Sequence, residues 1–328
     1  MAANRQNDMR DVMNEILREK LKEVPENPGI YKMLDKNGKI IYIGKSKCLK
    51  KRVHSYFVPT PKWDKARKMF PSICDIEWEV TDTHLEAMLL ECRLIKEIKP
   101  YFNTMMKNDE RYFYLNVSDS ARKSPLFVTY ERQEYSYGPF RSRGMIEEFV
   151  QTMKNFYPLN IKDGKYELEY HIFPVSMRNV IYQDNAERLR ELFDMPEKIE
   201  LFYDAIESQM AEVAAMQKFE MAIRYREFLE NIRYVQQYLN ETRNWMKEDV
   251  VYRVKTGDGY KLFYIRKGMV IYKALYKRVT AASERAFIRT ARKIESTENI
   301  SEKSRLDYVD IVCAELMQAG SDAVKIVR

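Results

Sequence analysis

Cysteine and histidine are scarce in this sequence of 328 residues. The four cysteines lie far apart, and no two have the C-x-x-C spacing of a zinc ribbon or an iron–sulfur cluster. The three histidines are too few for a histidine-rich metal cage, and no H-E-x-x-H motif occurs. We therefore expect no zinc, no iron–sulfur cluster and no disulfide framework. Any metal ion must be held by carboxylate groups and water.

Long apolar runs are also missing from the sequence. No stretch approaches the roughly 18 apolar residues that a membrane-spanning helix requires. The first residues form a polar and partly acidic helical stretch, which resembles neither a secretory signal nor a transit peptide. These absences predict a soluble, cytoplasmic protein without a membrane partner. The length leaves room for two or three small domains.

Acidic residues are nearly absent from one segment, although the net charge of the chain is only +7. Between Lys36 and Lys68 there are eleven Lys or Arg residues and one acid, Asp64. Aromatic residues are interleaved with these charges, which favours a surface that binds DNA phosphates and stacks on bases. A solvated face without a partner is about as common for a basic run alone. The DNA interpretation assigns contacts to Lys47, Lys50, Lys51, Lys62, Lys65, Arg67 and Lys68.

Hydrophobic periodicity and turn residues predict an α+β fold with five segments. In chain order these are a leader helix (1–24), a small mixed α/β domain (25–107), an accessory α/β region (108–185), a helical region containing a hairpin (186–247) and a strand meander followed by helices (248–328). The α/β domain should contain strands at 29–34, 39–45 and 75–80, and helices at about 49–57 and 83–99. We expect Thr83 to cap the second of these helices and its apolar stripe to be Leu85, Met88, Leu89, Cys92 and Ile95.

Two tripeptides on the predicted hairpin carry the strongest chemical signal. Gly29-Ile30-Tyr31 lies on the first strand and Tyr42-Ile43-Gly44 on the second. Together with Lys45, Arg52, Tyr56, Glu91 and Asn103, in this order and spacing, they resemble the motif of the GIY-YIG endonucleases. The stretches ENPGIYKMLDKNGKIIYIGKSKCLKKRVHSYF, HLEAMLLECRLIKEIKPYFN and GPFRS resemble the UvrC family of excinucleases. This resemblance is dense over 21–103 and fades through 277.

The resemblance implies hydrolysis of a DNA phosphodiester. It gives catalytic roles to Tyr31, Tyr42, Lys45, Arg52, Tyr56 and Asn103. Glu91 lies on the apolar side of its helix, where a carboxylate requires a cation, so we assign it as the ligand of Mg²⁺ or Mn²⁺. Tyr42 is our first choice of general base and Tyr31 the second, because Lys45 and the metal would favour a phenolate. Arg52 would clamp a phosphate oxygen, and Asn103 would hold the site in register.

Each of these residues also has an ordinary structural interpretation. Glu91 would be a partly exposed helix residue, the strand tyrosines would simply pack, and Arg52 would be a solvated charge. Asn103 would be a turn residue after Pro100. The chain-wide coincidence of the motif favours the catalytic interpretation.

The segment MAEVAAMQKFEMAIRYREFLENI resembles the UVR motif, the helical hairpin through which UvrC binds the helicase UvrB. The resemblance places partner contacts at Phe219, Glu220, Ala222 and Arg226, with Ile223 and Leu229 as further apolar contacts. An ordinary internal helix pair is the alternative.

Two features of the UvrC family are not matched. The region around His171 has no cysteine-rich stretch, and residues 247–277 resemble only the opening of the UvrC carboxy-terminal half. The chain thus resembles the short homologue Cho, with a UVR-like hairpin retained. Asp307 and Asp310 could suggest a second metal site, but their segment is typical of an amphipathic helix with solvated acids.

The expected function is DNA repair by nucleotide excision. The protein would make a single metal-dependent nick in double-stranded DNA, 3′ to a lesion marked by UvrB. One alternative is a stand-alone GIY-YIG nuclease acting on branched or foreign DNA. Another is a non-catalytic adaptor that docks DNA and UvrB.

Overall fold

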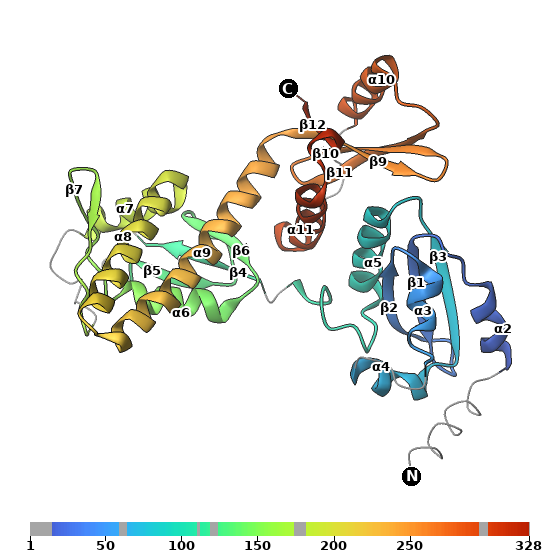
Figure 1. Cartoon of the computed structure of the whole chain (residues 1–328), viewed down its shortest axis with the longest axis horizontal. Helices are drawn as coiled ribbons and strands as arrows, with labels where there is room; N and C mark the ends of the chain where they lie inside the picture. The colour runs from blue at the N-terminus through green and yellow to red at the C-terminus, as the bar shows by residue number, and fades with distance from the viewer. Residues whose placement is uncertain are drawn as a thin grey trace, which may run out of the picture. The chain divides into compact units, whose positions relative to one another are not determined.

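The computed structural model describes residues 15–58, 64–109, 112–118, 124–173, 182–294 and 301–327. Most of the predicted leader helix and Lys62 lie outside the described residues, as does the side chain of Lys65. The chain has the expected α+β fold (Figure 1) and divides into two compact units. The first unit combines Met1–Asp109 with Met246–Arg328, and the second is Glu110–Trp245.

The amino-terminal part of the first unit is built on an antiparallel sheet of order β2-β1-β3. Its strands are β1 (Gly29–Leu34), β2 (Ile40–Ser46) and β3 (Asp75–Val80). The described helices are α2 (Glu15–Glu23), α3 (Leu49–His54), α4 (Asp64–Met69), η1 (Phe70–Ser72) and α5 (His84–Ile98). The predicted bounds of β1 and β3 are confirmed, and β2 is shifted by one residue.

Local chemistry sets the ends of these elements. The β1–β2 turn is closed by Asp35, whose carboxylate accepts hydrogen bonds from the backbone N–H groups of Asn37 and Lys39, at 2.8 and 3.0 Å. Thr83 caps α5, as predicted, because its side chain accepts a hydrogen bond from the N–H of Glu86. The helix ends where Lys99 takes a left-handed conformation (φ 50°) before Pro100.

The predicted apolar stripe of α5 is only partly right. Leu85, Cys92 and Ile95 are buried, but Met88 and Leu89 are half-buried. Glu86 is buried in their place, with 7% of its surface exposed. A buried helix face predicted from apolar residues alone does not include a charged residue, such as Glu86, that is buried by residues from elsewhere in the chain.

The second unit contains a sheet of order β5-β4-β6, a β-hairpin and helices. The elements are β4 (Phe113–Val117), β5 (Leu126–Thr129), β6 (Ser136–Phe140), α6 (Arg143–Met153), β7 (Asn160–Lys162), β8 (Lys165–Glu167), α7 (Tyr182–Asp194), α8 (Pro196–Ala215) and α9 (Phe219–Lys247). The predicted interruption of the helical region near Met216 is confirmed. Gln217 there has φ 59°, which lets the chain reverse between α8 and α9.

The carboxy-terminal part of the first unit, 248–328, is called here the C-terminal module. Its elements are β9 (Asp249–Thr256), β10 (Gly259–Arg266), β11 (Met269–Tyr276), α10 (Ala281–Arg292), α11 (Glu302–Gln318), η4 (Ser321–Ala323) and β12 (Val324–Val327). The meander is confirmed, but the expectation that the chain ends in helices is wrong. β12 pairs with β9, giving the order β11-β10-β9-β12. Its four residues are too few to show a hydrophobic period.

Helix α11 of the C-terminal module packs against α5 (Figure 1). The helix that carries Glu91 therefore lies between the amino-terminal sheet and the C-terminal module. Among the described residues, no helix is both long enough and apolar enough to cross a lipid bilayer.

Candidate active site

Three tyrosines meet beside the amino-terminal sheet. Tyr31 lies on β1, Tyr42 on β2 and Tyr56 just after α3. Their ring centroids are 5.7 to 6.1 Å apart. The hydroxyl groups of Tyr31 and Tyr56 share a hydrogen bond of 2.7 Å. Tyr31 and Tyr56 are also buried in the hydrophobic core, so the rings pack while their hydroxyl groups form a polar cluster.

The glycine of the second tripeptide leaves space for this cluster. Gly44 lies opposite Tyr31 in the β1–β2 pairing. A Cβ atom on Gly44 would lie 2.3 Å from the Tyr31 hydroxyl oxygen. The first tripeptide has a similar constraint, because a Cβ atom on Gly29 would lie 2.3 Å from the carbonyl oxygen of Glu79. Both glycines are therefore required by close packing.

Arg52 on α3 joins the tyrosine cluster. Its Nε donates a hydrogen bond of 3.2 Å to the Tyr31 hydroxyl oxygen. Its guanidinium carbon lies 5.2 Å from the centroid of the Tyr56 ring, within the range of a cation–π contact. The side chain is half-buried, and its fork of donors is fixed at the edge of the cluster.

Glu91 lies on α5 with its carboxylate directed at β2. Its Oε1 accepts a hydrogen bond of 3.1 Å from the backbone N–H of Lys45, and its Oε2 lies 3.4 Å from the Lys45 Nζ. The Glu91 side chain is only 12% exposed. Burial raises the pKa of Glu91, although the charge of Lys45 opposes this rise. A carboxylate that is largely removed from water is a suitable ligand for a divalent cation. The Lys45 ammonium group next to it shows that a positive charge is stabilised at this position.

The tyrosine pKa values differ from the sequence expectation. Burial, followed by the charge of Tyr56, raises the pKa of Tyr31 and Tyr42 above the ordinary value. The expected effect of Lys45 on Tyr42 is not seen, since Lys45 points at Glu91. Side chains alternate along a strand, so residues 42 and 45 of β2 point to opposite faces. Without a metal ion, the neutral phenol is the favoured form of both tyrosines.

Asn103 extends the edge of β2. Its Oδ1 accepts a hydrogen bond of 2.9 Å from the N–H of Ile43, and its Nδ2 donates one of 2.8 Å to the Ile43 carbonyl oxygen. The preceding Phe102 donates its backbone N–H to the carbonyl oxygen of Ile41 at 2.9 Å. The amide side chain thus satisfies the backbone of the middle residue of the Tyr42-Ile43-Gly44 tripeptide. It holds that strand in place rather than facing open solvent.

These residues form one site, and the sequence that contains them matches a known domain family. Residues 27–104 match the family model of the UvrC-like GIY-YIG domain. This chain carries a UvrC-like GIY-YIG domain. The match contains every residue of the site described above.

Sequence similarity to related proteins extends beyond the GIY-YIG domain. UvrABC system protein C of Desulfitobacterium hafniense (strain Y51) is 31% identical over 274 residues, which cover 78% of this chain and 44% of that protein. The protein of the same name from Nostoc sp. (strain PCC 7120 / SAG 25.82 / UTEX 2576) is 28% identical over 345 residues, which cover 95% of this chain and 54% of that protein. The chain spans about half the length of the curated relatives that it matches.

Solved structures also match the GIY-YIG domain. One of them is the N-terminal endonuclease domain of UvrC from Thermotoga maritima, bound to magnesium as its catalytic divalent cation. It is 37% identical and covers 28% of this chain and 100% of that domain, with a TM-score of 0.26.

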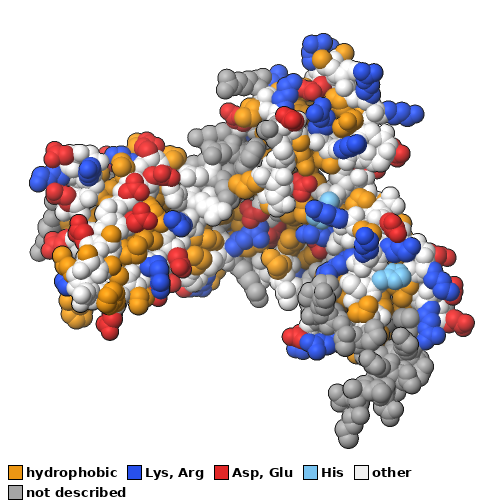
Figure 2. All heavy atoms as spheres, in the orientation of Figure 1, with side chains coloured by type: hydrophobic (Ala, Val, Ile, Leu, Met, Phe, Trp, Pro, Cys, Tyr) orange, Lys and Arg blue, Asp and Glu red, His pale blue; other side chains and the backbone are white. Residues whose placement is uncertain are grey.

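Of the basic residues assigned to DNA, those whose side chains the structure describes lie on the surface of the GIY-YIG domain. Figure 2 shows Lys and Arg side chains on the face that carries α3. The exposed members of the set are Lys47, Lys50, Lys51, Arg67 and Lys68. Two of them have acidic neighbours: Lys50 lies 3.7 Å from Glu26, and Arg67 pairs with Asp64. Exposed pairs of this kind are weak and would exchange readily for a phosphate.

The second unit holds the residues assigned to a partner protein. Phe219 begins α9 and is 64% exposed, Glu220 and Arg226 are exposed, and Ala222 is half-buried. Ile223 is also exposed, at 45%. Leu229 is 5% exposed and packs in the core of the second unit. The prediction that Leu229 contacts a partner is therefore wrong.

Asp307 is not the solvated residue that the sequence predicted. Its side chain is completely buried, and its carboxylate lies 2.6 Å from the Lys96 Nζ on α5. Within the described residues, no group of three or more His, Cys, Asp or Glu side chains could hold a metal ion. No local signal in the sequence predicts the contact of Asp307 with Lys96, because the two residues lie 211 positions apart.

Proposed function

We propose that this chain is a metal-dependent DNA endonuclease that makes a single nick 3′ to a lesion marked by UvrB. The observation that carries the proposal is the largely buried carboxylate of Glu91, only 12% exposed, next to Lys45 and beside a cluster of three tyrosines and Arg52. A carboxylate, a cluster of hydroxyl groups and a guanidinium group suit the hydrolysis of a phosphodiester. We keep 25–107 as the proposed extent of the nuclease domain.

Glu91 is the proposed ligand of Mg²⁺ or Mn²⁺. Such an ion, when bound, would stabilise the anionic charge that develops on the phosphate. Arg52 would donate to a phosphate oxygen from its fixed position against Tyr31. Tyr42 remains the proposed general base, with Tyr31 as the alternative. Asn103 would act on geometry, by keeping β2 and hence Tyr42 in place.

DNA is the proposed substrate, and the exposed lysines and arginines near α3 are its proposed phosphate contacts. The relatives are named as members of the UvrABC system, which supports a role in excision repair. A DNA substrate would also place the protein in the cytoplasm. Because the relatives are about twice as long, these roles are proposed from the nuclease domain and its site.

The proposal is tested with a duplex that has one defined lesion and is labelled at both ends of the damaged strand. We expect one nick on the 3′ side that requires UvrB and Mg²⁺. Glu91→Gln should lower the rate by at least ~100-fold, because it removes the charge that holds the cation. Glu97→Gln is the matched control, since Glu97 lies on the same helix but is exposed and pairs only weakly with Arg93, at 3.9 Å.

Each outcome separates the proposal from its alternatives. Cutting that needs no UvrB and prefers branched DNA would identify a stand-alone nuclease. Binding of DNA and UvrB without any cutting would identify an adaptor. Normal nicking by folded Glu91→Gln at limiting Mg²⁺ would remove Glu91 from the metal site.

We also propose that the start of α9 contacts UvrB. Phe219 offers an exposed apolar ring, and Glu220 and Arg226 offer opposite charges nearby. Phe219→Ala combined with Arg226→Glu should weaken binding of UvrB in titration calorimetry by at least ~10-fold. Cutting of a substrate that needs no UvrB should persist. If the folded variant binds UvrB with unchanged affinity, α8 and α9 are an ordinary internal helix pair.

A further inference from the structure

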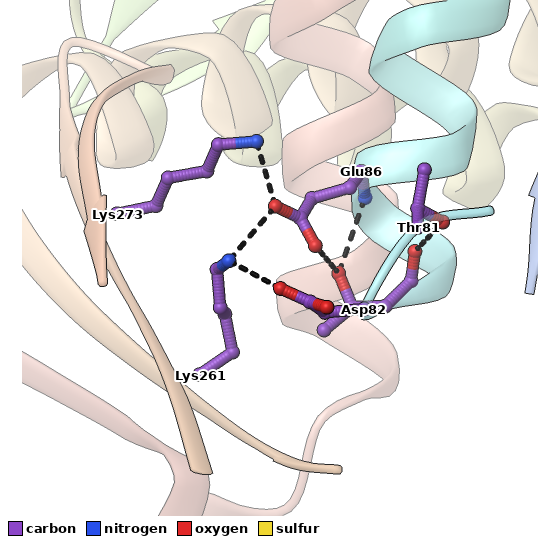
Figure 3. A network of polar contacts seen from close by, with 6 residues as sticks. Thr81, Asp82, Glu86, Lys261 and Lys273 are labelled. Atoms are coloured by element: carbon purple, nitrogen blue, oxygen red, sulfur yellow. Dashed lines mark hydrogen bonds and ion pairs between the residues drawn. The ribbon is translucent and has the colours of Figure 1, made fainter. Parts of the chain in front are cut away.

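The side of α5 near its amino-terminal end is held by two lysines of the C-terminal module (Figure 3). Glu86 is buried on α5, and one oxygen of its carboxylate lies 2.6 Å from the Nζ of Lys273 on β11 and 3.3 Å from the Nζ of Lys261 on β10. The other oxygen accepts a hydrogen bond from the Thr83 hydroxyl group at 3.2 Å. Lys261 also reaches Asp82, at 2.6 Å. We call these contacts the Glu86 clamp.

A second clamp holds α5 near its carboxy-terminal end. Lys96 is 14% exposed and lies between Asp307 of α11, at 2.6 Å, and Asp109. Asp109 in turn accepts a hydrogen bond from the hydroxyl group of Ser304, which is also on α11. We call these contacts the Lys96 clamp. The Glu86–Lys273 and Lys96–Asp307 pairs span 187 and 211 residues of sequence, so both clamps join α5 to a distant part of the chain.

The space between the C-terminal sheet and α5 is not completely filled. A cavity of about 620 Å³ that is open to solvent is lined by Leu89 and Arg93 of α5 and by Phe263, Met269 and Val270 of the C-terminal module. The clamps therefore add to the packing of α5 against α11 and the amino-terminal sheet, next to a space that packing leaves open.

Glu91 lies on α5 midway between Glu86 and Lys96, five residues from each. Its carboxylate points away from the clamps and contacts Lys45 on β2. A small rotation or shift of α5 would change the place of this carboxylate relative to the tyrosines. The clamps are thus attached to the element whose position the site depends on.

We propose that the C-terminal module positions Glu91 for cation binding, with Glu86 and Lys96 as positioning residues. The inference rests on the proposed function for its link to cutting. The attachment itself depends only on the contacts of α5. If the clamps loosen, α5 gains freedom and the affinity for Mg²⁺ falls, while the exposed lysines of the DNA surface are unaffected.

The test uses the full chain with Lys261→Met and Lys273→Met combined. This variant leaves the Glu86 carboxylate buried without its lysines, which is costly for a charged group. We expect the Mg²⁺ concentration at half-maximal cutting to rise by at least ~10-fold, the scale seen when groups that orient a ligand are removed. Affinity for DNA without Mg²⁺ should be unchanged. Backbone amides of 88–95 should exchange hydrogen faster than in the wild type.

Rescue distinguishes positioning from a general loss of stability. Adding Glu86→Leu to the double variant removes the buried charge and fills part of the cavity, so it should restore both Mg²⁺ dependence and exchange protection of α5. Arg93→Met is the matched control on the same helix, because Arg93 is exposed and contacts neither clamp. Asp307→Asn should independently reproduce a smaller rise through the Lys96 clamp.

The outcomes separate the two proposals. If the wild type cuts and the double variant keeps both the Mg²⁺ dependence and the protection of α5, the positioning role is refuted. If the wild type cuts no DNA at all, the proposed function fails, and hydrogen exchange alone then decides the attachment. Faster exchange in 88–95 that Glu86→Leu reverses would support it. Unchanged exchange would refute it.

Discussion

Asn103→Ala offers the sharpest test of how the nuclease site is held together. Ile43 is fully buried in the middle of β2, and the Asn103 amide group satisfies both its N–H and its carbonyl oxygen. The alanine variant leaves two buried backbone groups without these partners. Each such group costs about 1–3 kcal/mol, so the free energy of unfolding of this domain should fall by about 2–6 kcal/mol.

The assay combines urea unfolding with hydrogen exchange at the Ile43 amide, which reports on β2 alone even though the chain has two units. The free energy of the opening that exposes the Ile43 amide to exchange should fall by about the same amount, so the amide should exchange faster. Cutting should also fall, because Tyr42 and Gly44 flank Ile43. Asn37→Ala is the control, because Asn37 is an exposed turn residue. A loss under ~0.5 kcal/mol, typical of a surface substitution, would show that Asn103 is only a turn residue after Pro100.

The same site carries three further predictions. Gly44→Ala should lower the free energy of unfolding of the domain by about 1–3 kcal/mol, measured by urea unfolding, because the added methyl group overlaps the Tyr31 ring. The same substitution in a Tyr31→Ala background should lower it much less, which would verify the overlap. Because burial raises the pKa of Tyr42, the cutting rate at saturating Mg²⁺ should still be rising at pH ~9, and Tyr42→Phe should remove that rise; a plateau near pH ~7 would contradict a tyrosine base. At the acidic end, burial raises the pKa of Glu91, so Mg²⁺ affinity measured by calorimetry should weaken at a higher pH than for an ordinary carboxylate.

The elements of the GIY-YIG domain were predictable from the sequence because their signals are local. Asp35 and Gly38 define the hairpin turn, and Pro25 and Thr83 mark where one helix must end and another begins. Each signal acts over four residues or fewer. The tyrosine cluster was predictable for a different reason, since the order and spacing of the motif specify a family rather than a local conformation.

The contacts that lie outside these local signals were not predictable. The direction of Lys45 depends on the alternation of side chains along β2, which the expected effect on Tyr42 ignored. Lys273 lies 187 residues from Glu86, and Asp307 lies 211 residues from Lys96, so no window of sequence contains both members of either pair. Periodicity places a charged residue on the solvent face of a helix unless a distant partner is known. The same reasoning accounts for Leu229, whose burial depends on the core of the second unit.

The buried carboxylates themselves decide where a divalent cation can bind. Asp307 is fully buried at 2.6 Å from Lys96, whose side chain is 14% exposed, and Glu86 is held by two lysines, of which Lys261 is only 11% exposed. A cation at either position would have to displace a close ion pair and leave a lysine without its partner, which is costly. Glu91 differs, because the Lys45 Nζ is 3.4 Å away on a side chain that is 34% exposed and can turn to solvent. Of these three carboxylates, Glu91 can give up its lysine most easily, which supports its proposed role as the Mg²⁺ ligand.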